Sequence, residues 1–308
     1  MNKIEILALA PLAIISKALE DQYVVHRFWE NPDLEKHGPN IRAIATNGPT
    51  GVSASVLEKL PAVEIISVFG VGVDAIDLPE AKRRGIAVAT TQGVLTDDVA
   101  DQALALLIAL SRQTVAGDQF VRSGNPSWSS FPLTRRVTGK KVGILGLGSI
   151  GKALARRLMA LDMTISYTNR KPADVPFQFV PDIEKLAADS DFLIITASGG
   201  ESSRHIVNAR VLDALGPKGM LINVARGSVV DEEALISALE NRRIAGAGLD
   251  VFDNEPRISP KFFTLKNVVL APHAASGTVE TREAMGKLVL GNLAAHFAGE
   301  PLLTPLDF

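Results

Sequence analysis

The sequence predicts an α/β protein built from two parallel-sheet domains. Short apolar runs alternate with helix-like segments along the whole chain, and only the second half carries a glycine-rich turn. The chain has 308 residues, which is enough for two domains of ordinary size. It is 46% hydrophobic and only 5% aromatic, and such an aliphatic composition is typical of parallel strands that are buried on both faces.

Five apolar runs predict the strands of the first domain, at residues 4–10, 23–28, 41–46, 63–69 and 86–90. The first of these runs lies close to the initiating methionine, as the apolar part of a signal peptide would. However, Glu5 and Pro11 interrupt it and no convincing cleavage site follows. We therefore expect it to form the first buried strand.

Two segments connect the halves of the chain. Residues 99–112 (VADQALALLIALSR) have almost no polar side chain after Gln102, which predicts a long buried helix packed between the domains. Residues 122–140 are rich in Ser, Arg, Pro and Gly, which predicts an extended arm without regular secondary structure.

Six further runs predict the strands of the second domain, at 141–148, 163–168, 191–197, 219–225, 244–252 and 267–272. Helical segments separate several of them, at 151–161, 182–188 and 231–239. This alternation predicts a parallel sheet with right-handed crossovers. The last segment, which begins at Thr281, predicts an amphipathic helix and tail that cross back onto the first domain.

Composition and charge exclude several classes of protein. The net charge is −2 and there is no broad basic region, which argues against binding to nucleic acid or to an acidic membrane surface. No apolar run reaches the length of about 20 residues that a membrane-spanning helix needs. The chain contains no cysteine, so disulfides, thiolate metal sites and cysteine nucleophiles are excluded and a cytoplasmic location is expected. We expect no metal site, and we interpret His26, His37, His205 and His296 as structural or exposed.

The glycine-rich turn predicts a dinucleotide-binding, Rossmann-like domain. The motif GLGSIG follows a predicted strand and precedes a predicted helix, which is the context that gives the motif its meaning. Gly146 allows the tight turn, Gly148 lets the backbone approach a pyrophosphate, and Gly151 lets the helix pack on the strand. The N–H groups of Ser149 and Ile150 at the helix N-terminus are then expected to bind the phosphates.

The end of the next predicted strand indicates which dinucleotide binds. In this arrangement the strand usually ends in an acidic residue that binds the ribose hydroxyls, but here Asn169, Arg170 and Lys171 stand in that place. A carboxylate about 4 Å from a 2′-phosphate would cost on the order of 4 kcal/mol at a protein surface. Basic side chains replace this repulsion with charge-assisted hydrogen bonds. The sequence therefore predicts NADPH/NADP+ as the cofactor in preference to NADH.

Three polar residues follow successive predicted strands and suggest a reaction. Arg226, Glu255 and His273 each lie just beyond a strand C-terminus, where open α/β sheets bind their ligands. This set suits reduction of a 2-keto acid. Arg226 would bind the carboxylate and polarise the carbonyl, and His273 would donate a proton to the carbonyl oxygen. Glu255 would hold the imidazole and favour its protonated form.

Four motifs in this order resemble one family. The segments are GLGSIG, NVARGSVVDEEAL, GAGLDVFDNEP and PHAASGTVETR. Together they resemble the D-2-hydroxyacid dehydrogenases, and more narrowly their NADPH-dependent glyoxylate/hydroxypyruvate reductases and hydroxyphenylpyruvate reductases. The resemblance runs along nearly the whole chain. It implies that Arg226, Glu255 and His273 are the catalytic residues.

The resemblance also implies further site residues. It places Asp250 near the nicotinamide amide and Val224 and Ser276 against the cofactor. The segment FGVGVDAIDL (69–78) is similar to the family's substrate loop, in which the N–H groups of Val71 and Gly72 would bind the substrate carboxylate together with Arg226 and His273.

The expected organisation follows from these assignments. We expect a flavodoxin-like substrate (catalytic) domain from residues 1–95 and 288–308, a dinucleotide-binding Rossmann domain from residues 96–287, and an active-site cleft between them. Trp128 lies in the arm that, in related reductases, reaches the partner subunit, so a homodimer through the helix and arm at 99–140 is expected.

The expected activity is NADPH-dependent reduction of small 2-keto acids by hydride transfer, converting glyoxylate to glycolate or hydroxypyruvate to D-glycerate. Reduction of arylpyruvates and the other D-2-hydroxyacid dehydrogenase activities remain alternatives. A formate dehydrogenase of this fold would have Gln in place of Glu255, and a phosphoglycerate dehydrogenase would usually keep the ribose-binding acid. Outside enzymes, the alternative is a dinucleotide-sensing scaffold.

Overall fold

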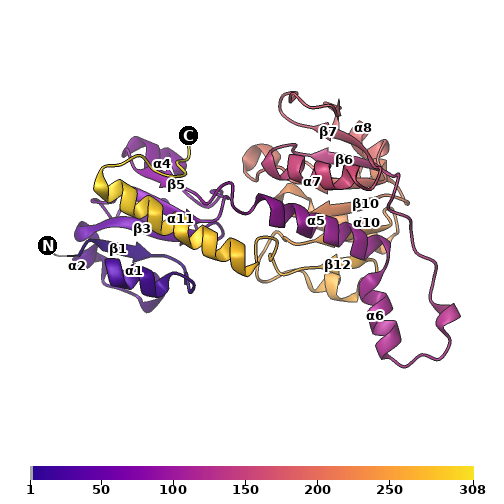
Figure 1. The fold of residues 1–308 in the computed structure, drawn as a ribbon, viewed down its shortest axis with the longest axis horizontal. Coiled ribbons are helices and arrows are strands. Elements are labelled where there is room, and N and C mark those ends of the chain that lie inside the picture. Colours follow the sequence, from indigo (N-terminus) through magenta and orange to yellow (C-terminus); the bar gives the residue numbers. More distant parts are fainter. Residues whose placement is uncertain (1–2) are drawn as a thin grey trace. The chain divides into compact units, whose positions relative to one another are not determined.

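The computed structural model describes residues 3–308, which form two compact units (Figure 1). Unit 1 comprises residues 3–95 and 277–308, and unit 2 comprises residues 96–276. Each unit is an α/β sandwich around one parallel sheet, which confirms the predicted fold class. The second boundary precedes helix α11 (Val279–Ala298), whereas the predicted boundary at residue 287 lies inside this continuous helix.

The sheet of unit 1 has five parallel strands in the order β2-β1-β3-β4-β5. The strands are β1 (Glu5–Ala8), β2 (Val24–Arg27), β3 (Ile41–Asn47), β4 (Ile65–Phe69) and β5 (Ala87–Ala89). Helices α2 (Leu34–His37), α3 (Ala54–Leu57) and α4 (Leu78–Arg83) accompany one core cluster, which contains Leu7 and Ile44. Helices α1 (Ser16–Gln22) and α11 contribute to the other, which contains Ile6, Ile65 and Val289. The C-terminal segment therefore completes the core of unit 1.

The sheet of unit 2 has seven parallel strands in the order β12-β11-β10-β9-β6-β7-β8. The strands are β6 (Lys141–Leu145), β7 (Thr164–Thr168), β8 (Gln178–Phe179), β9 (Phe192–Ile195), β10 (Met220–Asn223), β11 (Gly246–Leu249) and β12 (Val268–Leu270). Only β8, which is two residues long, was not predicted.

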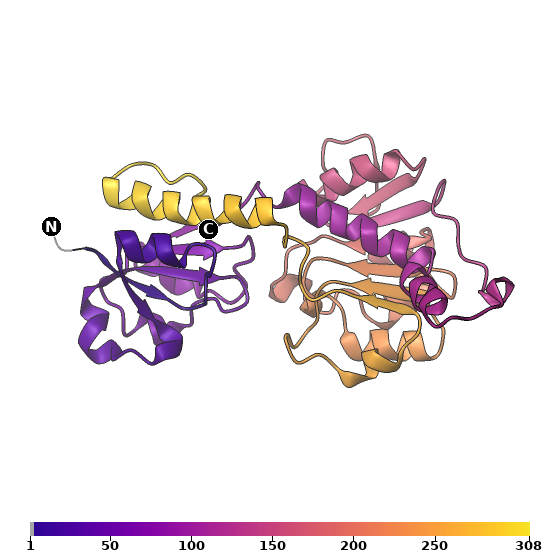
Figure 2. The same cartoon turned by 60° about the horizontal axis from the view of Figure 1, so that its bottom comes forward.

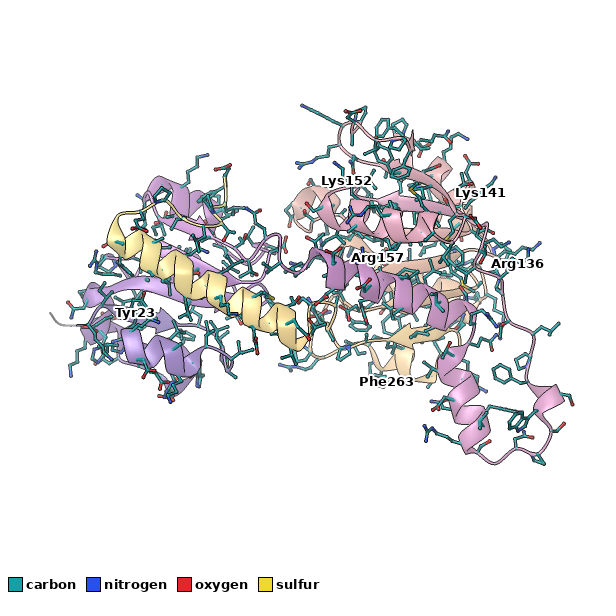
Figure 3. The ribbon with its side chains drawn as sticks, viewed as in Figure 1. Tyr23, Arg136, Lys141, Lys152, Arg157 and Phe263 are labelled. Carbon is teal, nitrogen blue, oxygen red and sulfur yellow. The ribbon has the colours of Figure 1, made fainter. Side chains whose placement is uncertain are left out.

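Helices cover both faces of this sheet (Figure 2). Helices α8 (Ile183–Ala188), α9 (Ala209–Leu215) and α10 (Glu232–Glu240) supply apolar side chains to the core cluster of one face. On the other face, α7 (Ser149–Met159) packs along α5 (Thr96–Ser111). Arg157, which is labelled in Figure 3, joins these two helices through ion pairs with Asp97 and Asp101.

The segment between α5 and β6 differs in part from its prediction. Helix α6 (Thr114–Arg122), which was not predicted, precedes the arm, and the arm itself contains only the short 3-10 helix η3 (Trp128–Ser130). Residues 123–127 and 131–140 have neither helix nor strand, as the composition indicated. Within residues 3–308, no helix combines the length and the apolar character that crossing a membrane requires.

Candidate functional site

The predicted site residues of unit 2 all lie at the carboxyl edge of its sheet. The last residues of five strands stand in one row of paired positions: Leu145, Ile195, Asn223, Leu249 and Leu270. Each strand then continues into a loop, and the loops after β6, β10, β11 and β12 carry the glycine-rich turn, Arg226, Glu255 and His273. Because the strands are parallel and end in register, residues far apart in sequence meet at one edge.

Two of the three glycines in the turn are required by close backbone contacts. Gly146 has φ +97°, and a Cβ there would lie 2.5 Å from backbone atoms of Ala197. A Cβ on Gly151 would lie 2.6 Å from the carbonyl oxygen of Gly146. Around Gly148, in contrast, no atom lies within 4 Å of a Cβ position. The turn is therefore tight at its ends and open in the middle, where a phosphate would approach.

The open turn leads into an uncapped helix N-terminus. Gly148 is the N-cap of α7, so no side chain caps the first N–H groups of the helix, which belong to Ser149 and Ile150. These donors and the helix dipole favour an anion at this position.

The loop after β7 supports the turn and presents two cations. Asn169 Oδ1 accepts a hydrogen bond of 2.7 Å from the N–H of Leu147, so Asn169 fixes the turn in addition to its predicted contact with the cofactor. Arg170 and Lys171 are exposed, and within residues 3–308 their side chains form no hydrogen bond or ion pair. Both cations are therefore available to an anionic ligand beside the glycine-rich turn.

His273 and Glu255 form a hydrogen-bonded pair. His273 Nδ1 lies 2.6 Å from Glu255 Oε2, and Glu255 Oε1 accepts a hydrogen bond of 2.8 Å from the N–H of Phe252. About a third of the His273 side chain is exposed (35%), so the ring is held on one side and accessible on the other. Because Glu255 engages Nδ1, Nε2 is the nitrogen left to act on a substrate.

Glu255 is kept ionised by its neighbours. Burial alone would raise the pKa of its carboxyl, but the hydrogen bonds from His273 and Phe252 and the charges of His273 and Arg226 outweigh this effect. The net result is a pKa below the ordinary value. The charged carboxylate therefore holds the imidazole of His273 through its Nδ1 atom.

A buried asparagine shapes the turn that carries Arg226. The Nδ2 group of Asn223 donates a hydrogen bond of 2.9 Å to the carbonyl oxygen of Arg226, and its Oδ1 accepts one of 3.0 Å from Ala225 N–H. Arg226 Nη1 in turn donates to the carbonyl oxygen of Ala225 at 2.7 Å. Asn223 is 1% exposed, so its buried amide stabilises the Arg226 turn from inside the protein.

Gly227 brings the Arg226 turn against the loop that carries Glu255. A Cβ on Gly227 would lie 1.9 Å from the carbonyl carbon of Phe252 and 2.3 Å from Asp253 N. No side chain fits in this space. The absence of a side chain at Gly227 therefore permits the close approach of the two loops.

We expect Gly227→Ala to push these loops apart. The free energy of unfolding should fall by about 1–3 kcal/mol, the usual cost of overpacking, and kcat/KM should fall with it. Urea unfolding and steady-state kinetics measure the two effects. Gly117→Ala is the matched control, because a Cβ there meets Phe131 at an ordinary 3.5 Å. If Gly117→Ala lost as much stability and kcat/KM as Gly227→Ala, the close contact of the two loops at Gly227 would not explain the loss.

Asp250 holds the backbone around His273. Its carboxylate oxygens accept hydrogen bonds of 2.9 Å from the N–H groups of Ala274 and Ala275, and its carbonyl oxygen accepts one of 2.8 Å from His273 N–H. Burial raises the pKa of Asp250, and the two N–H donors to its carboxylate oppose this rise. His273 has φ +53°, which is uncommon for a residue other than glycine, and the bonds to Asp250 stabilise this conformation.

Two residues implied only by resemblance lie in the same loops. Val224, the first residue after β10, is buried, and Ser276, three residues after His273, is partly buried. Asn223 was not predicted as a site residue, although a polar residue at the end of the apolar strand MLIN is a signal for one.

The loop after β4 in unit 1 has the features of an anion-binding loop. Within residues 3–308, no acceptor is bound by the N–H groups of Val71 and Gly72, and the Val71 side chain is exposed. The guanidinium of Arg282 lies 5.6 Å from the ring centre of Phe69, directly before this loop, and burial lowers the pKa of Arg282. Unit 1 thus places free N–H groups and a cation near one another, although only the N–H groups were predicted.

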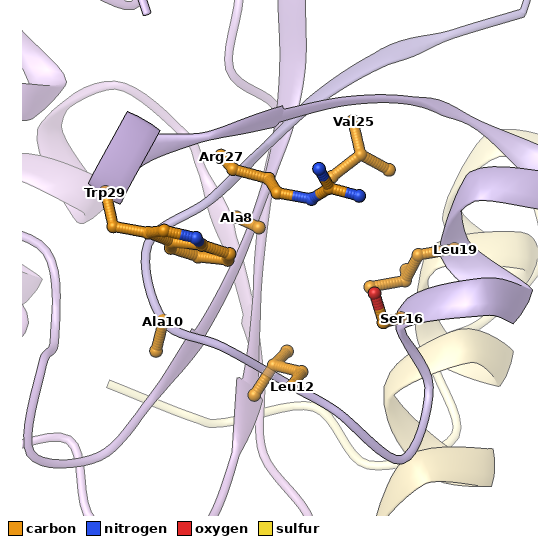
Figure 4. A pocket seen from close by; sticks show the side chains of 8 residues that line it. All are labelled: Ala8, Ala10, Leu12, Ser16, Leu19, Val25, Arg27 and Trp29. Atoms are coloured by element: carbon orange, nitrogen blue, oxygen red, sulfur yellow. The ribbon is translucent and has the colours of Figure 1, made fainter. Parts of the chain in front are cut away.

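Unit 1 also contains a small hollow between β1, β2 and α1 (Figure 4). It is lined by Ala8, Ala10, Leu12, Ser16, Leu19, Val25, Arg27 and Trp29. Its one cation, Arg27, forms ion pairs with Glu20 and Glu30 and is therefore already neutralised. We assign no function to this hollow.

Comparison with known proteins identifies the family. Residues 104–275 match the model of the D-isomer specific 2-hydroxyacid dehydrogenase, NAD binding domain. The chain belongs to the D-isomer specific 2-hydroxyacid dehydrogenase family. The resemblance drawn from the four sequence motifs is thereby confirmed, and the matched region contains the glycine-rich turn, Arg226, Glu255 and His273.

Relatives of this dehydrogenase cover its whole length. It is 48% identical to the 2-ketogluconate reductase of Gluconobacter oxydans over 99% of both chains. It is 47% identical to the glyoxylate/hydroxypyruvate reductase A HPR2 of Arabidopsis thaliana, over 99% of this chain and 100% of that one. Among solved structures, the NADPH-dependent glyoxylate/hydroxypyruvate reductase of Sinorhizobium meliloti, in complex with NADP and malonate, is 40% identical with a TM-score of 0.94. That match covers 99% of this chain and 97% of the other.

Proposed function

We propose that this 2-hydroxyacid dehydrogenase reduces small 2-keto acids with NADPH, converting glyoxylate to glycolate or hydroxypyruvate to D-glycerate. The observation that carries the proposal is the His273–Glu255 pair, with Nδ1 and Oε2 2.6 Å apart, at the same sheet edge as Arg226 and the glycine-rich turn. The identities of 47% and 40% to glyoxylate/hydroxypyruvate reductases support this choice of substrate.

In this proposal each unit has its own task. Unit 2 binds the dinucleotide, which when bound supplies a hydride from its nicotinamide ring. Unit 1 is the substrate domain, and the N–H groups of Val71 and Gly72 bind the substrate carboxylate. Arg226 acts on the substrate through its planar guanidinium, which can bind a carboxylate and polarise a keto group.

His273 completes the reaction as a general acid. The Nε2 atom of His273 would donate its proton to the carbonyl oxygen of the substrate, on which negative charge develops during reduction. The ionised Glu255 carboxylate fixes the orientation of the ring, with Oε2 2.6 Å from Nδ1. Asn223 and Asp250 act as positioning residues for Arg226 and His273 through their backbone hydrogen bonds.

The cofactor in this proposal is NADPH/NADP+, held by residues at the carboxyl edge of unit 2. Phosphates bind at Gly148, Ser149 and Ile150, where the turn is open and the helix uncapped. The 2′-phosphate binds to Arg170 and Lys171, which have no competing partner within residues 3–308. The NADP complex of the S. meliloti relative supports the same choice.

We expect Arg170→Ala to weaken the preference for NADPH. Loss of a hydrogen bond to a charged group should cost NADPH about 1.5–3 kcal/mol, whereas NADH has no 2′-phosphate to lose. The ratio of kcat/KM for NADPH to that for NADH should therefore fall by about tenfold or more. Higher salt should also weaken the wild-type preference, because exposed ion pairs are screened over about 10 Å at 0.1 M.

The control for this prediction is Arg210→Ala. Arg210 is also exposed, but it pairs with Glu184 and is not among the proposed cofactor residues. Its replacement should leave the cofactor ratio unchanged. If Arg170→Ala lost activity equally with NADPH and NADH, the loop would have no role in 2′-phosphate recognition.

A panel of 2-keto acids tests the substrate. Initial rates with glyoxylate, hydroxypyruvate, 2-ketogluconate, an arylpyruvate and pyruvate, each with NADPH and NADH, should show the highest kcat/KM for glyoxylate or hydroxypyruvate with NADPH. Preference for 2-ketogluconate would instead match the function of the 48% identical relative. Preference for the arylpyruvate would favour the alternative reductase, and no turnover at all would favour a dinucleotide-sensing scaffold.

We also propose a homodimer formed through residues 99–140. This region exposes apolar side chains that a monomer would leave in water: Ile108, Val115, Val121, Trp128 and Leu133. Trp128 is 70% exposed and Leu133 is 98% exposed, which is unusual for such large side chains on one connected segment. Light scattering should give the mass of two chains, and Trp128→Ser with Leu133→Ser should shift it toward one. A wild-type mass of one chain would refute the dimer.

We propose a cytoplasmic location for the enzyme, on the basis of composition. A chain without cysteine needs no oxidising compartment, and NADPH and small keto acids are available in the cytoplasm. Fractionation of the native cell, with detection of the full-length chain, tests this proposal.

A further inference from the structure

A cluster of potential metal ligands lies in unit 1, apart from the residues assigned to catalysis. It consists of Glu5 on β1, His26 on β2 and His37 at the end of α2. One ligand atom from each of these residues lies within 4.8 Å of the ligand atoms of the others. Three elements of different sequence regions therefore bring two imidazoles and one carboxylate to one place.

The fold determines this grouping. Strands β1 and β2 are parallel neighbours, with Glu5 paired to Val24 and Leu7 paired to His26. Glu5 and His26 thus project from the same face of the sheet, one step apart along the strands. Helix α2 lies on this face, since its Leu34 packs against the core cluster that contains Leu7.

The three side chains of the cluster contact one another. Glu5 Oε2 lies 2.7 Å from His26 Nε2, and the rings of His26 and His37 lie 4.5 Å apart. Within residues 3–308, no Lys or Arg forms an ion pair with Glu5. The side chains of His26 and Glu5 are 13% and 27% exposed, so the carboxylate is largely shielded from water, with an imidazole as its partner.

We propose that Glu5, His26 and His37 bind one divalent transition metal ion, Zn²⁺ being the expected ion, with water as the fourth ligand. Two imidazoles and a carboxylate are a known ligand set for tetrahedral zinc. Ligand atoms about 2.0–2.1 Å from the ion lie roughly 3.3 Å from one another. Ligand atoms already within 4.8 Å reach this spacing by small side-chain rotations.

The bound ion would cross-link elements at the edge of the sheet. Strand β2 is the outermost strand of unit 1, and α2 follows it in the chain. The ion would join both to β1, closing a loop between Glu5 and His37. Such a cross-link stabilises the folded state, because the ion binds only when the three ligands are together.

A second histidine–glutamate pair in unit 1 provides the matched control. His296 Nε2 lies 3.1 Å from Glu64 Oε2, but Arg42 also binds Glu64, with Nε 2.7 Å from Oε1. The guanidinium already neutralises this carboxylate and would repel a metal ion. The pair also lacks a second imidazole, so it should not bind zinc.

The test is calorimetric titration of the chelator-treated, full-length protein with ZnCl₂ alone. We expect one saturable zinc site per chain. His26→Gln and His37→Gln should each weaken binding by at least tenfold, the lower limit seen when even an indirect metal contact is removed. His296→Gln should bind zinc as the wild type does. Saturating zinc should raise the Tm of the wild type and of His296→Gln but not of the other two variants.

His37→Gln leaves the Glu5–His26 hydrogen bond intact, so it decides the outcome even if His26→Gln fails to fold. Absence of a one-to-one site in the wild type would overturn the proposal. Zinc affinity in His37→Gln equal to that of the wild type would overturn it as well, and so would equal weakening in His296→Gln.

Discussion

Replacing His273 with Ala should lower kcat by roughly 10²-fold or more, the usual contribution of a general acid. The reason is geometric, because His273 is the residue whose free ring nitrogen stands at the sheet edge while Glu255 holds the other nitrogen at 2.6 Å. Affinity for NADPH should barely change. Steady-state kinetics with hydroxypyruvate and a fluorescence titration with NADPH measure the two quantities.

The left-handed backbone conformation of His273 makes a second variant necessary, so that strain and loss of the general acid can be distinguished. Because His273 has φ +53°, part of any loss in His273→Ala could come from strain. Asn tolerates this conformation but cannot donate a proton in the same way, so His273→Asn should be equally inactive and more stable. His296→Gln should keep wild-type activity. Turnover near the wild-type rate in either His273 variant at neutral pH would refute its role as the acid.

Replacing Arg226 with Lys should have the second largest effect. The charge is kept, but the planar pair of donors that binds a carboxylate is lost. At about 1.5–3 kcal/mol for a hydrogen bond to a charged group, kcat/KM for the keto acid should fall by about tenfold to a hundredfold. KM should rise and kcat should fall, while NADPH affinity stays close to normal.

Arg210→Lys is the control for the general effect of exchanging an arginine, because Arg210 lies on the exposed surface of α9. Arg210→Lys should leave kcat, KM for the keto acid and the affinity for NADPH unchanged. An equal loss of NADPH affinity and substrate affinity in Arg226→Lys would assign Arg226 to cofactor binding or to folding instead of to the substrate.

Much of the fold could be predicted because its signals are local. Eleven apolar runs were predicted as strands, and all eleven are strands in the structure, from β1 to β12 without β8. Strand β8 has only two residues, too few to give a periodic pattern. Helix α6 was missed because it has only nine residues and Gly117, a poor helix former, lies near its middle.

The sequence could predict which residue types lie at the strand ends of the site, but it could not predict the hydrogen bonds between them. The sequence placed Arg226, Glu255 and His273 beyond successive strands, and the parallel register brings these ends together. The bonds from Asn223 to the Arg226 turn and from Asp250 to the His273 loop depend on loop conformation, which no pattern in the sequence reveals. The histidine cluster of unit 1 was missed for the same reason, since each of its members looks ordinary alone.

The central claim is hydride transfer from NADPH to carbon 2 of a 2-keto acid. The most direct test uses NADPH that carries deuterium at the position of the nicotinamide ring from which the hydride is transferred. The full-length enzyme is incubated with this NADPH and hydroxypyruvate. The product is then analysed by mass spectrometry and by chiral chromatography. The account predicts D-glycerate with one deuterium on carbon 2. Glycerate without deuterium, the L-enantiomer, or no product with any keto acid of the panel would contradict it.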